Sequence, residues 1–544
     1  MAVITVNKFS GVSPMTPPRY LSNEAAQTAL NCPVWKGSLQ PIKGALELTP
    51  SPLTKSGNIK YIYRFGQSET NQLNHWFHWT TDVDVVQGFI AGDATERTYY
   101  TGDGNPKVTN ATMALSGGGS DYPIASYDIG VPKPTGTFTT AKTGTPNANT
   151  TSETRVYTFT YVNSFGEEST PYSETDMSAS TEDVFPGESV VVTMPTGTLN
   201  NVNVTKKRIY RSALGTANTS YFFVAEVSLA TATYTDSLDG DDLNEELPSL
   251  TWVQPPTTLK GLVGMPNGVM AGFSGNDVYF SEPFRPFAWP TQYVQTVGYP
   301  VVGLGVIDTT VVVLTKGRPY FIQGSHPDSS VMVEADVNQA CISKRSIVSM
   351  NNHVFFASPD GIVALSPGGS SIVTESLFDK ETWQAQSPDD LVACMYETQY
   401  VGFFDTTSGN GGFVYDMKQK TWNFHNVYVT GAYNDLKNDA LYIIKSNELY
   451  KWDSGTDLSY TWKSKKYTFP EPKAFSCYRV EAEAYPITVK IYKDSSAIVN
   501  LSVTDNSLRR LPPGLGTTWE FQLEGDKEVY NVQLAQTPQE LNQG

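Results

Sequence analysis

The chain has 544 residues, which is enough for three or four domains with their own hydrophobic cores. Aromatic residues make up 12% of it, and with Thr, Val, Gly and Pro also abundant the composition favours β-sheets over helical bundles. The 38 basic and 55 acidic residues leave a formal charge of −17, which argues against tight non-specific binding of nucleic acid but not against a protein past which DNA slides.

Residues 1–58 are predicted to form an extended, proline-rich arm with one short helix. Ser22 can cap a helix over the sequence NEAAQTAL, with Glu24 in its first turn. Because prolines remove backbone donors, the rest of this segment should lie across a surface, and we expect it to reach a neighbouring subunit. Deletion of residues 1–21 should then leave a folded chain that cannot assemble. The candidate interface residues are Phe9, Pro14, Pro17, Pro18, Tyr20, Leu21 and Trp35.

Residues 59–130 contain the apolar runs IKYIYRF, NHWFHW and RTYYTG, which we interpret as strands of a first propeller blade. His75 and His78 stand three positions apart in the second run. On a strand such positions point to opposite faces, so the pair is expected to pack among aromatic side chains and not to share a metal ion.

Residues 131–256 lie between the proline-marked linkers VPKPTG and VQPP. Short strands at even spacing predict a β-sandwich inserted into the propeller, and the segments NSFGEES and RIYRS resemble fibronectin type III modules. The acidic residues at its end could hold Ca²⁺, but they lack the order of a known calcium loop, and we favour a solvated linker. They are Asp239, Asp241, Asp242, Glu245 and Glu246.

Residues 257–461 repeat one sequence pattern, a hairpin of two apolar strands, as in VFFASPDGIVAL. A hairpin repeated about every 40–50 residues has the period of a propeller blade, and blades in a ring bury one another's faces. Residues 462–544 are again β-rich with a local excess of Lys and Arg, and they predict either a second sandwich or strands that close the propeller. The second strands of the five hairpins end near Phe280, Phe321, Leu365, Tyr415 and Trp452.

The sequence offers no catalytic signature. It contains no P-loop, GxSxG, HExxH or dinucleotide motif, and its five histidines stand in no recognisable arrangement. The four cysteines form no CxxC pair, so we expect buried free thiols in a protein made in a reducing cytoplasm. No signal peptide and no apolar run long enough for a membrane helix is visible. We therefore predict no enzyme activity, no metal and no cofactor.

Several segments resemble one family of virion proteins from short-tailed bacteriophages. The most specific stretch, between Leu259 and Trp383, includes LKGLVGMPNGVMAGFSGNDVYFSEPFRPFAWP and ACISKRSIVSMNNHVFFASPDGIVALSPGG. The segments FSGVSPMTPPRYLSNEAAQTALNCPVWKGSLQPI and RLPPGLGTTWEFQLEGDKEVYNVQLA extend the resemblance over most of the chain. The family is the tail nozzle, also called tail hub or tail tubular protein B.

The resemblance implies a homohexameric ring in the virion tail, assembled in the host cytoplasm below the portal and its adaptor (the head-to-tail connector). Such a ring retains packaged double-stranded DNA, opens for genome ejection, and can carry tail fibres or spikes. From composition and pattern we expect an all-β protein whose blades close into a wheel with a negatively charged hole that serves as the passage. Two alternatives stay open: a receptor- or glycan-binding tail adhesin, and a propeller glycan hydrolase.

Overall fold

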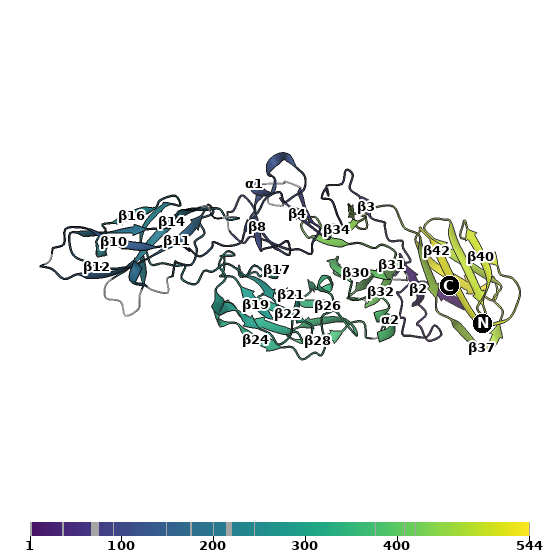
Figure 1. Cartoon of the computed structure of the whole chain (residues 1–544). Coiled ribbons are helices and arrows are strands. Elements are labelled where there is room, and N and C mark those ends of the chain that lie inside the picture. Colours follow the sequence, from purple (N-terminus) through teal and green to yellow (C-terminus); the bar gives the residue numbers. More distant parts are fainter. Residues whose placement is uncertain are drawn as a thin grey trace.

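A computed structural model describes residues 3–34, 37–66, 75–90, 92–147, 149–173, 177–197, 199, 201–213, 220–243, 245–375, 377–406, 409–418 and 420–542. The chain is almost entirely β, which confirms the predicted fold class. It forms three bodies in a row (Figure 1): the inserted sandwich at one end, a central body of small sheets, and a C-terminal sandwich at the other end.

Among the described residues the central body is built from six small sheets and from four strands of a ten-stranded sheet that continues through β2 into the C-terminal sandwich. We number these seven groups of strands as blades in chain order. Blade 1 is β4 (Tyr61–Phe65) and β5 (His75–Trp79); blade 2 is β6 (Asp84–Gln87), β7 (Thr98–Thr101), β8 (Lys107–Thr109) and β9 (Tyr127–Asp128). Blade 3 is β17 (Lys260–Gly264), β18 (Met270–Ser274), β19 (Asp277–Phe280) and β20 (Gln295–Thr296); blade 4 is β21 (Val301–Ile307), β22 (Thr310–Thr315), β23 (Tyr320–Gln323) and β24 (Val331–Glu334). Blade 5 is β25 (Val348–Met350), β26 (His353–Ser358), β27 (Gly361–Ser366) and β28 (Gly369–Ile372); blade 6 is β29 (Val392–Tyr396), β30 (Gln399–Thr406), β31 (Gly409–Asp416) and β32 (Thr421–His425). Blade 7 is β33 (Gly431–Asp435), β34 (Ala440–Lys445), β35 (Glu448–Lys451) and β3 (Leu46–Glu47), the last contributed by the N-terminal arm.

The blades close into a ring because neighbouring blades bury apolar side chains against each other. A cluster of such side chains lies at each contact between two neighbouring blades. The first strands of consecutive blades lie side by side around the centre, as β6, β17 and β21 do. Blades 1 and 2 complete the ring, where the Trp79 and Tyr100 ring centroids are 5.2 Å apart. In the described part of the chain the central body is thus a seven-bladed propeller.

The hairpins singled out in the sequence are the second and third strands of blades 3 to 7, as in the pairing of β26 with β27. Residues 59–130, however, form two blades where one was expected. In the described residues β5 and β6 do not pair, and the chain turns between them over residues 80–83. The aromatic runs alone did not reveal this break.

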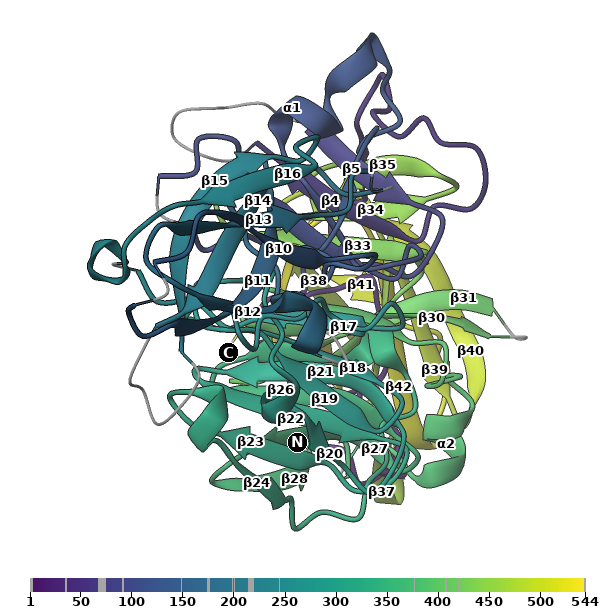
Figure 2. The same cartoon turned by 60° about the vertical axis from the view of Figure 1, so that its left-hand side comes forward.

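The insert leaves blade 2 after β9 and returns to blade 3 before β17. One of its sheets contains β10 (Thr139–Gly144), β13 (Glu188–Thr193) and β16 (Thr233–Asp236); the other contains β12 (Thr181–Val184), β11 (Glu153–Asn163), β14 (Val204–Ser212) and β15 (Tyr221–Ser228). The two sheets enclose a separate apolar core around Phe159 and Ile209. Figure 2 brings this sandwich forward, with the C-terminal strands behind the central sheets.

The C-terminal sandwich is not built from contiguous chain alone. One sheet contains β36 (Tyr460–Ser464), β37 (Tyr467–Lys473), β39 (Ile487–Lys493), β40 (Ser496–Val503) and β42 (Gly516–Gly525). The other contains β38 (Cys477–Ala482), β41 (Arg509–Arg510), β43 (Val529–Ala535) and the N-terminal strand β1 (Val3–Val6), which pairs with β43. Of the two alternatives for this segment, the structure therefore has a sandwich.

The short helix expected after Ser22 is wrong. Ala26–Leu30 forms strand β2, which pairs antiparallel with β36 and meets β32 in parallel at Leu30 and Phe424. Ala26 and Ala29 are buried in the same apolar cluster as blades 5 and 6 and the C-terminal sandwich. Local helix preference is small, and the free edges of two sheets outweigh it here.

Candidate functional site

The propeller axis contains a cavity of about 200 Å³. Its walls come from all seven blades, because every blade contributes residues in or just before its first strand. Liquid water occupies about 30 Å³ per molecule, so the cavity has room for about six or seven waters. The lining residues are Lys60, Tyr61, Asp84, Gly261, Val263, Gly303, Leu304, Lys344, Arg345, Ile347, Val392, Ala393, Gly431 and Ala432.

An ion-pair cluster crosses this axis. Lys344 Nζ lies 2.9 Å from Asp82 Oδ2 and 2.6 Å from Asp84 Oδ2. Arg345 also pairs with Asp82, and its Nη2 donates to the carbonyl oxygen of Val83 at 2.7 Å. The guanidinium lies over the Tyr61 ring, 4.7 Å from its centroid.

The partners stand on opposite sides of the ring. Lys344 and Arg345 lie in a 3₁₀ turn, Lys344–Ser346, directly before blade 5, whereas Asp82 and Asp84 lie at the start of blade 2. Blades 3 and 4 separate them on one side, and blades 6, 7 and 1 on the other. The cluster therefore ties two blades that are not neighbours in the ring and obstructs the centre of the propeller.

Burial governs the electrostatics of this cluster. Desolvation raises the pKa of Asp84, with Lys344 opposing the shift, and desolvation lowers the pKa of Arg345. Two carboxylates face two cations, so their charges balance. The expected negatively charged hole is thus wrong for the axis of a single chain. Duplex DNA, whose major groove alone is about 12 Å wide, cannot pass through so small a cavity.

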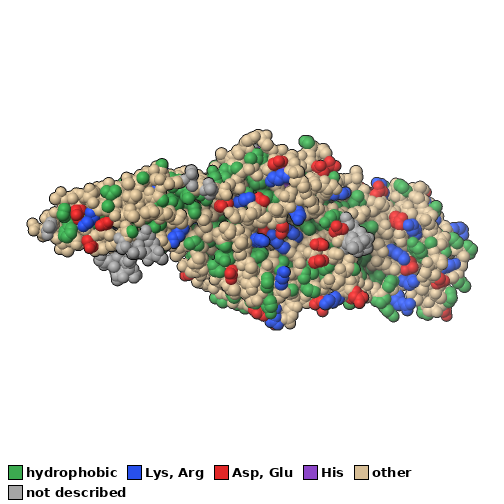
Figure 3. Space-filling model, in the orientation of Figure 1, with side chains coloured by type: hydrophobic (Ala, Val, Ile, Leu, Met, Phe, Trp, Pro, Cys, Tyr) green, Lys and Arg blue, Asp and Glu red, His purple; other side chains and the backbone are tan. Residues whose placement is uncertain are grey.

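Charge is also mixed on the face of the molecule shown in Figure 3. On the face shown in Figure 3, Lys and Arg side chains lie among Asp and Glu side chains over the propeller and the C-terminal sandwich. The net charge of −17 is therefore not gathered into one acidic patch on this face.

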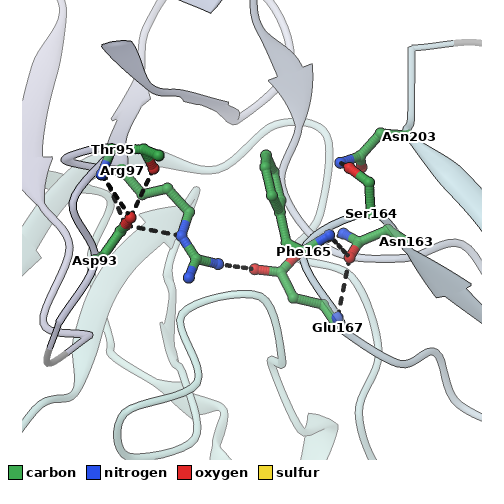
Figure 4. Close-up of polar contacts among 8 residues, drawn as sticks. All are labelled: Asp93, Thr95, Arg97, Asn163, Ser164, Phe165, Glu167 and Asn203. Atoms are coloured by element: carbon green, nitrogen blue, oxygen red, sulfur yellow. Dashed lines mark hydrogen bonds and ion pairs between the residues drawn. The ribbon is translucent and has the colours of Figure 1, made fainter. Parts of the chain in front are cut away.

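A second polar network joins the insert to blade 2 (Figure 4). Arg97 Nε lies 2.9 Å from Asp93 Oδ2, and its Nη1 lies 3.2 Å from Glu167 Oε1 of the insert. The guanidinium also lies 5.1 Å from the centroid of Phe165. Asn163 Nδ2 donates to Glu167 Oε2 at 2.7 Å, so both carboxylate oxygens are engaged. This network orients the insert against the propeller.

Some of the candidate interface residues of the arm are buried in the structure and others are exposed. Phe9 and Leu21 are buried in this chain's own core, and Phe9 meets Trp462 edge-on with ring centroids 5.0 Å apart. These two side chains cannot line a contact with a neighbour. Pro14, Pro17, Pro18 and Tyr20 are exposed, whereas Trp35 lies outside the described residues. An assembly role for the exposed four stays a prediction.

The other residues noted in the sequence have structural roles. His78 is buried, with its Nε2 accepting the backbone N–H groups of Thr54 and Lys55, both at 3.1 Å. All four cysteines are buried free thiols, as predicted. The described residues contain no cluster of three or more His, Cys, Asp or Glu able to hold a metal ion, including around Asp239 and Glu246. No helix in the described ranges is long and apolar enough to cross a membrane.

Sequence reasoning missed the axial cluster. The signal was present as the pair Asp82 and Asp84 at the start of one strand and the adjacent Lys344 and Arg345 before another. About 260 residues separate the two motifs, however, and only the closed ring brings them together.

Comparisons with known proteins identify no family. No family model and no curated protein matches the sequence. Among solved structures, the chain is similar to BamB from Moraxella catarrhalis, with 13% identity, a TM-score of 0.24 and coverage of 54% of this chain and 91% of that one. It is also similar to PorZ, a surface component of the type-IX secretion system of Porphyromonas gingivalis, with 12% identity, a TM-score of 0.24 and coverage of 89% and 82%. With TM-scores this low, neither similarity bears on the function of this chain.

Proposed function

We propose that this chain is a structural subunit of a short-tailed phage tail, the nozzle, and that several copies form a ring below the portal and adaptor. The single observation that carries the proposal is the obstructed axis. Because an ion-pair cluster ties the blades across it, we treat the propeller as a rigid building block. Together with the resemblance of Leu259–Trp383 to nozzle proteins, this favours a role in assembly.

In this proposal the DNA passage lies between copies and not through the blades. Six chains, each with a net charge of −17, would give the assembled ring a large negative net charge, although charge is mixed on the face shown in Figure 3. Phosphates would be repelled at long range and the genome could move without adhering. Retention and release of DNA then depend on contacts between copies.

The row of three bodies supplies separate surfaces for separate partners. The insert and the C-terminal sandwich lie at opposite ends of the propeller (Figure 1), so one end can meet the adaptor while the other meets fibres or the next tail component. The proposed partners are other copies of the chain, the portal adaptor, tail fibres or spikes, and passing double-stranded DNA.

Electron microscopy and mass photometry of the purified chain, with and without its adaptor, test this proposal. We expect rings of six copies, either spontaneously or after the adaptor is added. A chain that stays monomeric under both conditions, and that is absent from purified tails, would overturn it.

One observation favours a second candidate, a glycan-binding adhesin. The insert has a pocket of about 460 Å³, lined by Phe185 and by polar groups that include Glu153, Arg155 and Asp239. Glycan arrays with the whole chain distinguish the two: saturable binding that is lost in Arg155→Ala, together with a monomeric chain, would favour the adhesin.

A further inference from the structure

The outermost strand of blade 4 exposes apolar side chains on both faces. In β24, Val331 is 60% exposed, Met332 36% and Val333 50%. The outermost strand of blade 5, β28, is also solvent-exposed but consists of Gly369, two serines and Ile372. The edge of blade 6 is covered by β2. Among the described outermost strands of the propeller blades, β24 is therefore the one that combines four residues, an uncovered edge and exposed apolar groups.

The hydrogen-bond pattern shows which backbone groups point away from the blade. β24 pairs antiparallel with β23, with Val333 opposite Phe321 and Met332 opposite Ile322. The N–H of Ala335 donates to the carbonyl oxygen of Pro319 at 2.9 Å, which makes that pair a hydrogen-bonded one. Because such pairs alternate, Val333 and Val331 bond inward, and the N–H and C=O groups of Met332 and Glu334 point outward.

We propose that β24 is a strand-addition site for an extended segment of another protein. Outward N–H and C=O groups on alternate residues match the backbone of one further antiparallel strand. Side chains of that strand opposite Val331 and Val333 would be apolar, since cross-strand pairs of β-branched residues stabilise a sheet. A helix or a folded surface would leave the outward groups unpaired.

The occupant is a different protein and not a second copy. This chain's own N-terminal extended segments are already used, since β1, β2 and β3 pair within the chain. Pairing of β24 with β24 about Val333 would place two Glu334 carboxylates diagonally across the new pair, each with one ion pair to its own Arg318. The Glu334 carboxylate at this edge and the chain's net charge of −17 favour a partner segment flanked by basic residues.

Amide hydrogen exchange with a probe peptide tests the proposal on the full chain. The probe is a heptapeptide of alternating valine and threonine with a lysine at each end, used at about 1 mM because short strand contacts are weak. We expect exchange of the Met332 and Glu334 amides to slow by about tenfold, with no change in β28. The same peptide methylated on alternate backbone nitrogens should have no effect.

Two variants complete the test. Val333→Lys keeps an exposed position exposed and should abolish the protection, whereas Ser371→Lys on β28 should leave it unchanged. Equal protection by the methylated peptide, or no protection by either peptide, would overturn the proposal. Protection that rises with protein concentration without peptide would also overturn it, in favour of self-pairing. The peptide and variant outcomes do not depend on whether the chain forms rings, so this inference and the proposed function can fail separately.

Discussion

The two sandwiches at the ends of the molecule are joined to the propeller in different ways. The insert is one contiguous stretch with its own apolar core, and its ends lie side by side, since a Cβ on Gly130 would lie 3.3 Å from the Cα of Gln254. The C-terminal sandwich includes β1 from the other end of the chain, and its core is continuous with blades 5 and 6. The insert should therefore unfold by itself, and the C-terminal sandwich together with the propeller.

Deletions give the largest expected effect. Removing residues 1–21 takes away β1, Phe9 and Val12, so we expect loss of the cooperative fold of the C-terminal sandwich, in contrast to the folded product expected from the sequence. Replacing residues 131–253 with two glycines should change the melting temperature of the remaining chain by no more than a few degrees. Calorimetry and limited proteolysis check both. Equal damage from the two deletions would contradict the comparison.

A single substitution in the arm should reproduce part of this effect. Phe9→Ala empties a fully buried site against Trp462 and should lower the free energy of unfolding of the propeller and C-terminal unit by about 3–5 kcal/mol. Tyr20→Ala, at a position 71% exposed in the same arm, should change it by no more than about 0.5 kcal/mol. Denaturant titration measures both, and similar values would show that the arm is not part of the core.

Protonation of one buried histidine should destabilise the propeller and C-terminal unit and not the insert. His425 lies at the end of β32 with its ring between Phe403 and Trp452, at centroid distances of 5.2 and 5.0 Å, and burial lowers its pKa to about 3. Between that pH and its ordinary pKa of about 6.5, the unfolded chain binds a proton that the folded chain does not, so stability falls as pH falls.

From pH 7 to pH 4.5 this histidine alone should lower the free energy of unfolding by about 2–3 kcal/mol. His425→Phe should remove that portion of the acid sensitivity, while His353→Gln on the blade 5 surface should retain it. Denaturant titrations at several pH values measure the slope. An unchanged slope in His425→Phe would contradict the assignment, and the insert should show no response to either variant.

The smallest effect is expected at the junction of the insert. Glu167→Gln weakens the contact with Arg97 but leaves Arg97 paired with Asp93. Because the glutamine can still accept from Asn163 and Arg97 stays paired with Asp93, we expect a change of about 1 kcal/mol in stability and faster amide exchange around Asn163 and Phe165. Arg318→Gln, which breaks an exposed ion pair with Glu334 on blade 4, is the matched control. Slower exchange at the junction would contradict its orienting role.

How much of the fold could be predicted from the sequence depends on how far apart in the chain the contacting residues lie. Hairpins of blades 3 to 7 and the strands of the insert arise from nearby residues, and apolar runs with turns such as Ser358–Gly361 suffice to identify them. The strand Ala26–Leu30 was mistaken for a helix because its partners, β36 and β32, lie about 400 residues away. Local propensity cannot register pairing over that separation.

The axial cluster illustrates the same limit for the candidate site. Acidic residues at 82 and 84 and basic residues at 344 and 345 are ordinary surface patterns on their own. Their meaning depends on the number of blades between them, and the sequence indicated one blade over residues 59–130 where the structure has two. The prediction of an acidic hole was wrong because the net charge of a whole chain does not show where its acidic side chains lie.

The most direct test of the account is a cryo-electron microscopy reconstruction of an assembled, DNA-filled tail. We predict DNA density between copies of the chain, with Lys344 and Arg345 of every copy still meeting Asp82 and Asp84 across a closed propeller. Density for DNA threading the blades of one chain, or a propeller with this cluster opened around a bound sugar, would contradict it.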